Sequence, residues 1–401
     1  MQTMDYIRLE DTYSAHTYHA LDLVIARGEG IWVWDVEGNK YIDCLSAYSA
    51  LNQGHRHPRI VKALIDQAER VTLTSRAFRN DQLPLLAKEL CELTGYERML
   101  PMNSGAEAVE TALKAARLWG HRVKGIPAGQ AEIIACEHNF HGRTITILSM
   151  STEELYRDGF GPFTPGFKVV DYGDPAALEA AITPNTAAFL VEPIQGEAGV
   201  IVPPDGYLKA VREICDRHNV LLIADEIQSG LGRCGQWFAC DWEGVTPDMI
   251  TIGKALSGGM LPVSAVVGNS EVLGLFGPGS HGSTFGGSPL ACAVARESLK
   301  VLADEKLPDR ARELGVAFRN GLREIRSPYV KEIRGKGLLI GVELKEEAGP
   351  ARPFVQQLQA RRVLAKETHG TVIRFAPPLI IKKEEIDLIL ERVREVLLPS
   401  A

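Results

Sequence analysis

The feature that most restricts the fold is a series of short, uninterrupted apolar runs between about residues 100 and 270. The runs are AEIIAC, AAFLVEP, VLLIADE and MITIGK, and helix-like stretches such as GYLKAVREICDRHN separate them. Strands that are buried on both faces between crossover helices have this pattern. The pattern predicts an α/β domain with a mostly parallel sheet, whose ligands bind at the carboxyl ends of the strands.

Different patterns flank this region. In residues 25–55, GIWVWD and KYIDCL are joined by VEGN, a turn of the hairpin type. After Pro289, the helical LACAVARESLKVLADE and RARELGVAFRNGLREI precede the strand-like GKGLLIGVEL and TVIRFAPPLI and a closing helix, KKEEIDLILERVREVLL. We therefore expect an N-terminal segment with a small β element (1–50), a large α/β domain (51–290) and a smaller α+β domain (291–401).

The composition excludes several classes of partner. A net charge of -7 gives no basic surface for nucleic acid or an anionic membrane, so small-molecule chemistry is favoured. The seven cysteines are scattered without a CxxC pair, which predicts a reducing compartment and neither a disulfide framework nor a metal site. The N-terminus has no apolar signal region, and no apolar run is long enough to span a membrane. We expect a cytoplasmic protein.

Two charged residues follow apolar runs. Lys254 closes MITIGK, and Asp225 closes VLLIAD 29 residues earlier, a separation that allows one crossover back into the same sheet. A lysine amine and a carboxylate at one sheet edge suit pyridoxal phosphate, which needs a Schiff-base partner and an anion beside its pyridine nitrogen. A solvated lysine and a helix-capping aspartate are the alternatives, and Glu226 offers the same chemistry as Asp225.

A phosphate-binding position is predicted at a helix start. In PMNSGAEAVETALKAARLWG, Ser104 and Glu107 form a Ser-x-x-Glu capping box that opens an amphipathic helix. The exposed amides of Ser104, Gly105 and Ala106 can hold a phosphate dianion, although such a box more often marks an ordinary helix start. A second cluster, HGSTFGGSP, either supplies hydroxyls to the phosphate or is a flexible loop.

The order of these motifs resembles that of the class III, fold-type I aminotransferases, and within them the ornithine aminotransferases. The resemblance covers essentially the whole chain. It rests on LSAYSALNQGHRHP, MNSGAEAVETALKAAR, NFHGRT, VEPIQGEAG, ADEIQSGLGRCG, GKALSGG, GSTFGGSP, RGKGLL and IRFAPP. It implies a pyridoxal phosphate enzyme with a mostly parallel seven-stranded sheet in its large domain, a smaller α+β C-terminal domain, and a homodimer with shared active sites.

The resemblance also implies which residues hold the cofactor. Lys254 would bind it as a Schiff base and, once released, shuttle the substrate proton, a role that requires a lowered pKa. Asp225 would pair with the pyridine nitrogen. Gln228 would contact the phenolic oxygen of the cofactor, and Phe140 would stack on its ring. Gly105 and Ala106 would bind the phosphate together with Thr284 of the partner subunit.

The implied substrate residues include two arginines. Arg143 of NFHGRT and Arg374 of IRFAPP would each bind a carboxylate, because a guanidinium fork matches a carboxylate in two places. Glu197 of QGEAG would pair with Arg374 during the first half-reaction. Ornithine would then place its carboxylate on Arg143 and Tyr18 and present its δ-amine, while Tyr48 would recognise ornithine itself.

The implied reaction is transfer of the δ-amino group of L-ornithine to 2-oxoglutarate, giving glutamate 5-semialdehyde and glutamate. His141 stands where some ornithine aminotransferases have tryptophan, and it receives no catalytic role. A class III enzyme for N-acetylornithine or 4-aminobutyrate is the nearest alternative, against which Tyr18 and Tyr48 argue. A non-catalytic binding protein of the same fold is a second, against which Lys254 argues. The absence of a GxGxxG after an early strand disfavours a nicotinamide dehydrogenase.

Overall fold

The computed structural model describes residues 1–398, so the end of the predicted 291–401 domain lies outside the described residues. Its centre is a seven-stranded sheet with the order β4-β10-β9-β8-β7-β5-β6. The five neighbouring strands β9, β8, β7, β5 and β6 run parallel to one another, whereas β10 is antiparallel to both of its neighbours. The prediction of a mostly parallel seven-stranded sheet is confirmed. The strands are β4 (Arg98–Met102), β5 (Glu132–Cys136), β6 (Phe167–Val170), β7 (Thr186–Val191), β8 (Leu221–Asp225), β9 (Met249–Ile252) and β10 (Ser264–Gly268).

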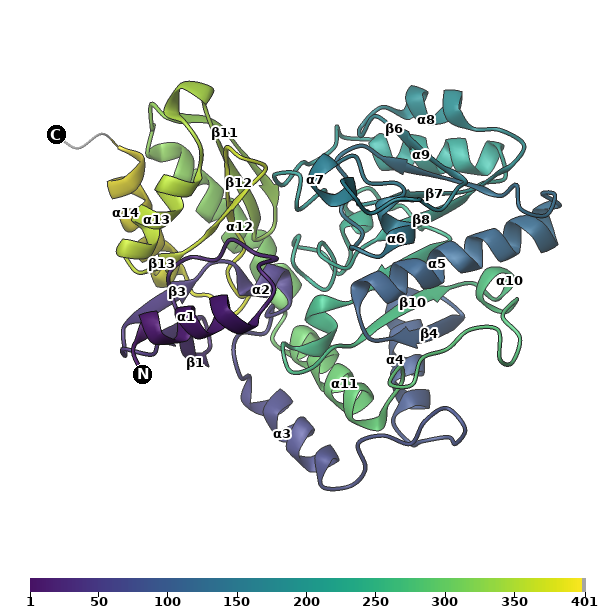
Figure 1. Cartoon of the computed structure of the whole chain (residues 1–401), viewed down its shortest axis with the longest axis horizontal. Coiled ribbons are helices and arrows are strands. Elements are labelled where there is room, and N and C mark those ends of the chain that lie inside the picture. Colours follow the sequence, from purple (N-terminus) through teal and green to yellow (C-terminus); the bar gives the residue numbers. More distant parts are fainter. Residues whose placement is uncertain (399–401) are drawn as a thin grey trace.

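The four apolar runs form β5, β7, β8 and β9 because both faces of the sheet are covered. Along β7, Phe189 and Val191 face one hydrophobic core, while Ala188 and Leu190 face another that is built largely against α5 (Gly105–Trp119). Both faces must therefore be apolar, which explains the uninterrupted runs. Figure 1 shows α5 crossing one face of the sheet and α8 and α9 lying beyond β6 and β7.

Helices of varied length surround this sheet. None within residues 1–398 is long and apolar enough to cross a membrane. Between residues 46 and 304 the helices are α2 (Ser46–Ser49), α3 (Pro58–Ala68), α4 (Leu83–Thr94), α5, the π-helix η1 (Gly120–Lys124), α6 (Ile145–Leu148), α7 (Glu154–Arg157), α8 (Pro175–Ala181), α9 (Tyr207–Arg217), the 3-10 turns η2 (Ala239–Trp242) and η3 (Lys254–Ser257), α10 (Ser270–Leu273) and α11 (Pro289–Asp304).

Two four-stranded sheets lie beside the large one. The predicted hairpin is β2 (Trp32–Asp35) paired with β3 (Lys40–Asp43), and it belongs to the sheet β1-β2-β3-β13. The other sheet has the order β11-β12-β15-β14. The further elements are α1 (Thr3–Tyr13), β1 (Ile25–Glu29), α12 (Leu307–Glu324), β11 (Val330–Lys336), β12 (Leu339–Leu344), η4 (Glu346–Ala348), α13 (Arg352–Ala360), β13 (Val363–Leu364), β14 (Lys366–Thr368), β15 (Val372–Phe375) and α14 (Lys383–Leu397).

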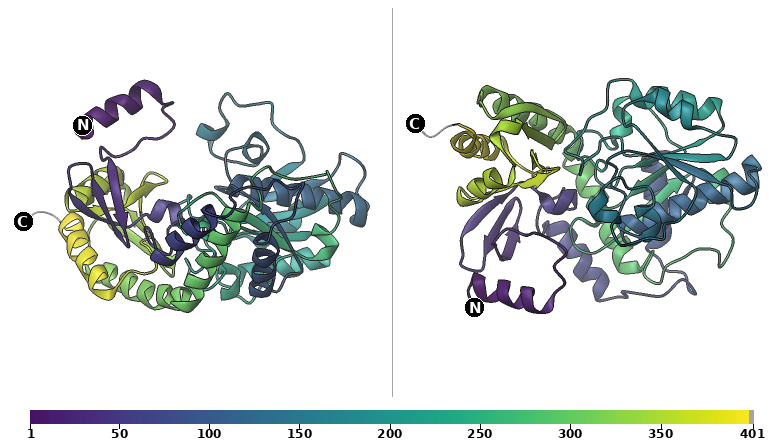
Figure 2. Two further views of the ribbon diagram at one scale, coloured as in Figure 1. Left: turned by 90° about the horizontal axis from the view of Figure 1, so that it is seen from below. Right: turned by 45° about the horizontal axis from the view of Figure 1, so that its top comes forward.

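The N-terminal strands join the C-terminal part of the chain, since β3 pairs in parallel with β13. Figure 1 and both views of Figure 2 accordingly show the purple N-terminal strands beside the yellow C-terminal elements, apart from the large sheet. The sequence boundaries at residues 50 and 290 stay predictions. As a consequence, Lys254, just beyond the end of β9, lines one cavity together with Tyr18 and Tyr48 from the beginning of the chain and residues 366–369 near its end.

Candidate active site

Three ionisable side chains meet where adjacent parallel strands end. Glu192 directly follows β7, Asp225 ends β8, and Lys254 lies two residues beyond β9. All three line a cavity of about 200 Å³. Since the order β9-β8-β7 makes these strands neighbours, their carboxyl ends deliver the three groups to one place. The other lining residues are Gly105, Ala106, Phe140, His141, Gly142, Ile227 and Gln228.

Asp225 is held by three donors. Its Oδ1 accepts hydrogen bonds from Thr251 Oγ1 at 2.9 Å and from the Ile227 amide at 3.2 Å, and its Oδ2 accepts one from His141 Nδ1 at 2.6 Å. Burial lowers the pKa of His141, but the hydrogen bond and charge of Asp225 outweigh burial and raise it. The histidine is therefore suited to donate Nδ1–H to Asp225 and to fix the orientation of the carboxylate.

Glu226, the alternative left open by the sequence, does not line this cavity. Its carboxylate accepts hydrogen bonds from the Cys240 amide at 2.9 Å and from the Ser229 hydroxyl. Burial is the main cause that raises the pKa of Glu226 to about 7. Of the two neighbouring carboxyl groups, Asp225 is the one that faces Lys254.

The amine of Lys254 is buried, and burial lowers its pKa. The negative charges of Glu197 and Asp225 oppose this effect, and the positive charge of Arg374 adds to it. The backbone of Lys254 has φ 44°, in the left-handed region that non-glycine residues seldom adopt. A buried amine with a lowered pKa is a nucleophile and a proton acceptor, provided that a ligand supplies the group it attacks.

The N-terminus of α5 also lines this cavity, through Gly105 and Ala106. Ser104 Oγ accepts a hydrogen bond from the Glu107 amide, and the Glu107 carboxylate accepts one from the Ser104 amide, so the predicted capping box is confirmed. The box leaves the amides of Gly105 and Ala106 in the first turn without a helical acceptor. A side chain at residue 105 would lie 3.1 Å from the Ile227 side chain, so glycine lets the backbone line the cavity.

The residues of this cavity fit the predicted cofactor. Pyridoxal phosphate carries an aldehyde, a pyridine nitrogen and a phosphate, and the cavity offers a buried amine, a carboxylate and a helix N-terminus to match them. His141 Nε2 is buried without a hydrogen-bond partner among the described residues, so the wall retains an unused donor or acceptor.

A second cavity of about 400 Å³ continues from Lys254 toward solvent. Four of the five substrate residues implied by the sequence motifs line it directly: Tyr18, Tyr48, Arg143 and Glu197. Arg374 reaches the same place through Glu197, and its guanidinium lies 5.2 Å from the centre of the Tyr48 ring. The further lining residues are Ala47, His138, Asn139, Phe140, Glu153, Tyr156, Ala198, Lys366, Glu367, Thr368 and His369.

The wall of this cavity contains an ion pair, of which Glu197 is the lining member. Arg374 Nη1 lies 2.7 Å from Glu197 Oε1, and Gln228 Nε2 donates to the same oxygen at 3.0 Å. Burial raises the pKa of Glu197, but the charge and hydrogen bond of Arg374, with the Gln228 bond, lower it to about 2. A Cβ atom on Gly196 would lie 1.4 Å from Gln228 Oε1, so only glycine allows this approach. Glu197 is therefore an anion that neutralises the charge of Arg374 through the Nη1 group.

Arg143 has no such partner. No carboxylate within residues 1–398 forms an ion pair with it, and its guanidinium lies over aromatic rings, 4.4 Å from the centre of Tyr156 and 6.0 Å from that of Tyr18. The Tyr18 side chain is largely exposed. The cavity thus contains one arginine already neutralised by a glutamate and one arginine available to an anionic ligand.

The structure does not bring Thr284 to the site within one chain. It is exposed in the loop between α10 and α11, and it lines neither cavity. This placement is compatible with the predicted contact in a partner subunit, which stays a prediction.

Sequence reasoning missed Glu192 and Tyr156. Burial is the main cause that raises the pKa of Glu192 to about 7, and its Oε2 accepts a hydrogen bond from the Phe140 amide at 3.0 Å. Its position at the end of AAFLVEP is the same signal that identified Asp225. Tyr156 lies in a short helix with no motif of its own, so nothing in the sequence indicated it.

Comparisons with known proteins agree with this geometry. The family model for class III aminotransferases matches residues 13–397. The chain is 59% identical over 395 residues to an ornithine aminotransferase from Geobacillus sp., covering 98% of each protein.

Two solved structures are similar over nearly the whole chain. An ornithine aminotransferase from Toxoplasma gondii is 50% identical with a TM-score of 0.97, covering 99% of this chain and 95% of that one. An acetylornithine aminotransferase from Elizabethkingia anophelis is 47% identical with a TM-score of 0.89, covering 99% of each. The chain therefore belongs to the class III aminotransferase family, whose cofactor is pyridoxal phosphate.

Proposed function

We propose that this protein transfers the δ-amino group of L-ornithine to 2-oxoglutarate, giving glutamate 5-semialdehyde and glutamate. The observation that carries the proposal is the unequal state of the two arginines beside Lys254. Arg374 is paired with Glu197, whereas Arg143 faces the cavity without a carboxylate. The family membership and the ornithine aminotransferases among its relatives support the same substrate.

The paired arginine explains which amine reacts. If Arg374 were free, the α-carboxylate of ornithine would bind there and place the α-amine beside Lys254. With Glu197 on Arg374, the carboxylate goes instead to Arg143, at the outer side of the cavity with Tyr18. The δ-amine, at the far end of the substrate, then lies toward Lys254. Tyr48, which contacts Arg374 through its ring face, borders the path between them.

The second half-reaction needs the opposite arrangement. 2-Oxoglutarate carries two carboxylates, which require both arginines. Arg374 Nε and Nη2 are buried without hydrogen-bond partners among the described residues, so the guanidinium retains donors for a second carboxylate. We infer that the oxo acid displaces Glu197 from Arg374. Ornithine, with one carboxylate, has no equal means of opening the pair.

The chemical roles of the chain follow from the same positions. Gly105, Ala106, Phe140, Asp225, Gln228 and Lys254 would hold pyridoxal phosphate. When bound, this cofactor supplies an electron sink for the carbon that loses a proton. Lys254 Nζ accepts that proton and returns it, since burial lowers the pKa of the amine. Asp225 would keep the pyridine nitrogen of the bound cofactor protonated, and His141 holds the Asp225 carboxylate in position.

The assembly and location are separate proposals. We propose a homodimer in which Thr284 of the partner subunit completes the phosphate site, because the exposed loop around residue 284 reaches neither cavity of its own chain. Mass measurement in solution at several concentrations tests the dimer. A Thr284→Ala variant should weaken cofactor retention, whereas unchanged retention would remove this residue from the site. The cytoplasmic location stays a prediction.

The experiment that tests the substrate is a single-turnover absorbance measurement on the cofactor-loaded protein without any oxo acid. L-ornithine, N-acetylornithine, 4-aminobutyrate and glutamate are mixed with it separately. Ornithine should convert the cofactor absorbance to the pyridoxamine form fastest. A preference for N-acetylornithine would be consistent with an aminotransferase but would refute the assignment of ornithine as its substrate. The name of the Elizabethkingia anophelis relative contains acetylornithine. Absence of any cofactor absorbance after incubation with pyridoxal phosphate would refute both the aminotransferase activity and the ornithine substrate.

A further inference from the structure

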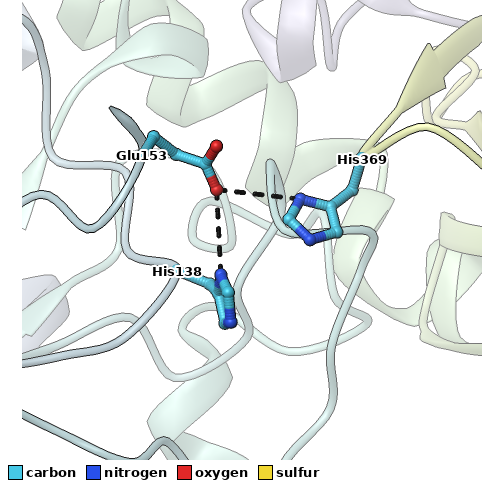
Figure 3. Close-up of side chains that lie close together, drawn as sticks. All are labelled: His138, Glu153 and His369. Carbon is cyan, nitrogen blue, oxygen red and sulfur yellow. Dashed lines mark ion pairs between the residues drawn. The ribbon is translucent and has the colours of Figure 1, made fainter. Parts of the chain in front are cut away.

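Three side chains that no motif joins lie together at the outer part of the substrate cavity. His138 belongs to the loop after β5, Glu153 immediately precedes α7, and His369 lies in the turn between β14 and β15. They are far apart in the sequence, yet all three line the larger cavity. Figure 3 shows both imidazole rings directed at one Glu153 carboxylate oxygen.

The geometry of this cluster leaves a space between its polar atoms. His138 Nδ1 lies 3.7 Å and His369 Nδ1 3.9 Å from Glu153 Oε1, which is too far for a hydrogen bond. One ligand atom from each residue lies within 4.8 Å of the other two. A cation at their centre would be about 2.5 Å from each, a few tenths of an ångström longer than the distances that zinc prefers. Small side-chain rotations close that difference.

The backbone around the cluster is held in place. The His138 amide donates to Thr152 Oγ1 at 2.8 Å, which ties the first histidine's loop to the residue before Glu153. His138 and His369 both have positive φ, 56° and 49°, in the left-handed region. Such conformations cost free energy in non-glycine residues and often occur at ligand sites. Two strained turns therefore direct two imidazoles at one carboxylate.

We propose that His138, Glu153 and His369 bind one Zn²⁺ ion at the entrance to the substrate cavity. Two imidazole nitrogens and one carboxylate oxygen are a common zinc ligand set, and a water molecule completes the tetrahedral site. The set suits Zn²⁺ better than Mg²⁺ or Ca²⁺, which prefer oxygen ligands alone. Six of the seven cysteines are buried and the other is half-buried, so exposed thiols do not compete for the ion.

The bound ion would connect two parts of the cavity wall. His138 and Glu153 come from the large α/β region, whereas His369 comes from the C-terminal β14–β15 turn. Beside it, Thr368 Oγ1 donates to the backbone oxygen of Glu197 at 2.5 Å, so this turn also contacts the segment that carries the Glu197–Arg374 pair. Zinc would hold the β14–β15 turn against the large α/β region. It would thereby narrow the opening through which a substrate reaches Arg143 in the same cavity. We therefore expect Zn²⁺ to slow substrate entry.

Binding is tested first, by isothermal titration of Zn²⁺ into the cofactor-loaded protein without substrate. One ion per chain should bind, and His138→Asn, His369→Asn and Glu153→Gln should each weaken binding by more than about tenfold, since loss of even an outer-shell partner costs about 10–100-fold. His218→Asn is the matched control, because His218 lies 3.3 Å from Glu179 but has no second histidine. Mg²⁺ should not bind.

Two outcomes would overturn the proposal. One is no Zn²⁺ binding to the intact protein. The other is equal affinity in the control and in all three cluster variants, which would mean that the ion binds elsewhere and that the histidines only surround an exposed glutamate. A circular dichroism spectrum and a melting curve for each variant exclude misfolding as the cause of weakened binding.

The effect on entry is tested by single-turnover rates with ornithine at increasing Zn²⁺. The rate should fall in the intact protein and in His218→Asn, and it should stay insensitive in His369→Asn. If the titration shows Zn²⁺ binding but the single-turnover rate does not change with Zn²⁺ concentration, the expected effect on substrate entry would be refuted and the zinc site would stand. This part rests on the proposed function, whereas the titration does not, so failure of the ornithine assignment and failure of the zinc site are distinguishable.

Discussion

Replacing Glu197 with alanine should change which amino acid reacts first with the cofactor-loaded protein. The variant frees Arg374, which is buried, from its only carboxylate partner among residues 1–398. The α-carboxylate of glutamate can then bind Arg374 without displacing a side chain. Ornithine can bind in the same way with its α-amine inward, so its productive δ-amine orientation loses its advantage. The ratio of kcat/KM for glutamate over ornithine should rise.

The magnitude follows from the strength of the pair. The pKa of Glu197 is lowered from 4.5 to about 2, against the opposing effect of burial, and Arg374 is the largest cause of the lowering, with smaller contributions from Gln228 and Lys254. The net shift corresponds to roughly 3 kcal/mol at about 1.36 kcal/mol per pKa unit, of which the ion pair is the main part. A quarter of the Glu197 side chain remains exposed, so water screens part of this interaction. We assign about 1.4–2.7 kcal/mol to the Glu197–Arg374 pair, which predicts a rise of about 10- to 100-fold in the specificity ratio.

The assay is the single-turnover absorbance change of the cofactor with ornithine and with glutamate, measured for the intact protein, Glu197→Ala and Glu197→Gln. Glutamine retains an oxygen that can accept from Arg374 but removes the charge, so its ratio should lie between the other two. An unchanged ratio in a Glu197→Ala protein that melts normally and holds its cofactor would refute the proposed role of the Glu197–Arg374 pair in selecting the amine.

Three further changes test other parts of the site and the fold. Lys254→Ala should still retain pyridoxal phosphate by non-covalent contacts while turnover falls by at least about 100-fold, the lower end for a lost acid–base group; substantial remaining transamination would identify another lysine. Arg143→Ala should lower kcat/KM for ornithine by about 10- to 100-fold, because charge-assisted hydrogen bonds contribute roughly 1.5–3 kcal/mol, with Tyr156→Phe as a control that keeps the ring. Glu226 has its pKa raised to about 7 in the folded protein, so the folded state holds a proton that the unfolded state loses above about pH 4.3. Its contribution therefore reduces stability as the pH rises from about 4.5 to 7, by an amount on the order of 3 kcal/mol. Glu226→Gln should flatten this part of the pH profile in urea unfolding, and an equally steep profile would contradict the assignment.

The sequence predicted the parts of the fold that local patterns determine. Strands buried on both faces need apolar residues at every position, so β5, β7, β8 and β9 were visible as runs. The capping box at Ser104 was visible because both of its hydrogen bonds join residues three positions apart. The strands β4, β6 and β10 were not predicted, since β4 and β6 are the two edges of the sheet and β10 is antiparallel to its neighbours, and their pairing depends on distant segments.

The candidate site divides in the same way. Residues at strand ends, such as Asp225, can be inferred from the chain because parallel strands deliver their carboxyl ends to one edge. The ion pair between Glu197 and Arg374 was implied only by the family's motifs, because the two residues are 177 positions apart. The cluster of His138, Glu153 and His369 has no local signal at all. Its members meet because the β14–β15 turn packs against the loop after β5.

Two adjacent carboxyl groups show why the last step required the structure. Asp225 and Glu226 are neighbours at the end of a strand, so their side chains point in opposite directions. Asp225 points toward Lys254 and His141, and it accepts hydrogen bonds from three donors, which suits it to hold a cationic ring nitrogen. Glu226 points toward the Cys240 amide and the Ser229 hydroxyl, where burial raises its pKa to about 7. The same functional group therefore serves the site at one position and the core at the next, and only the surroundings of each carboxyl group distinguish the two.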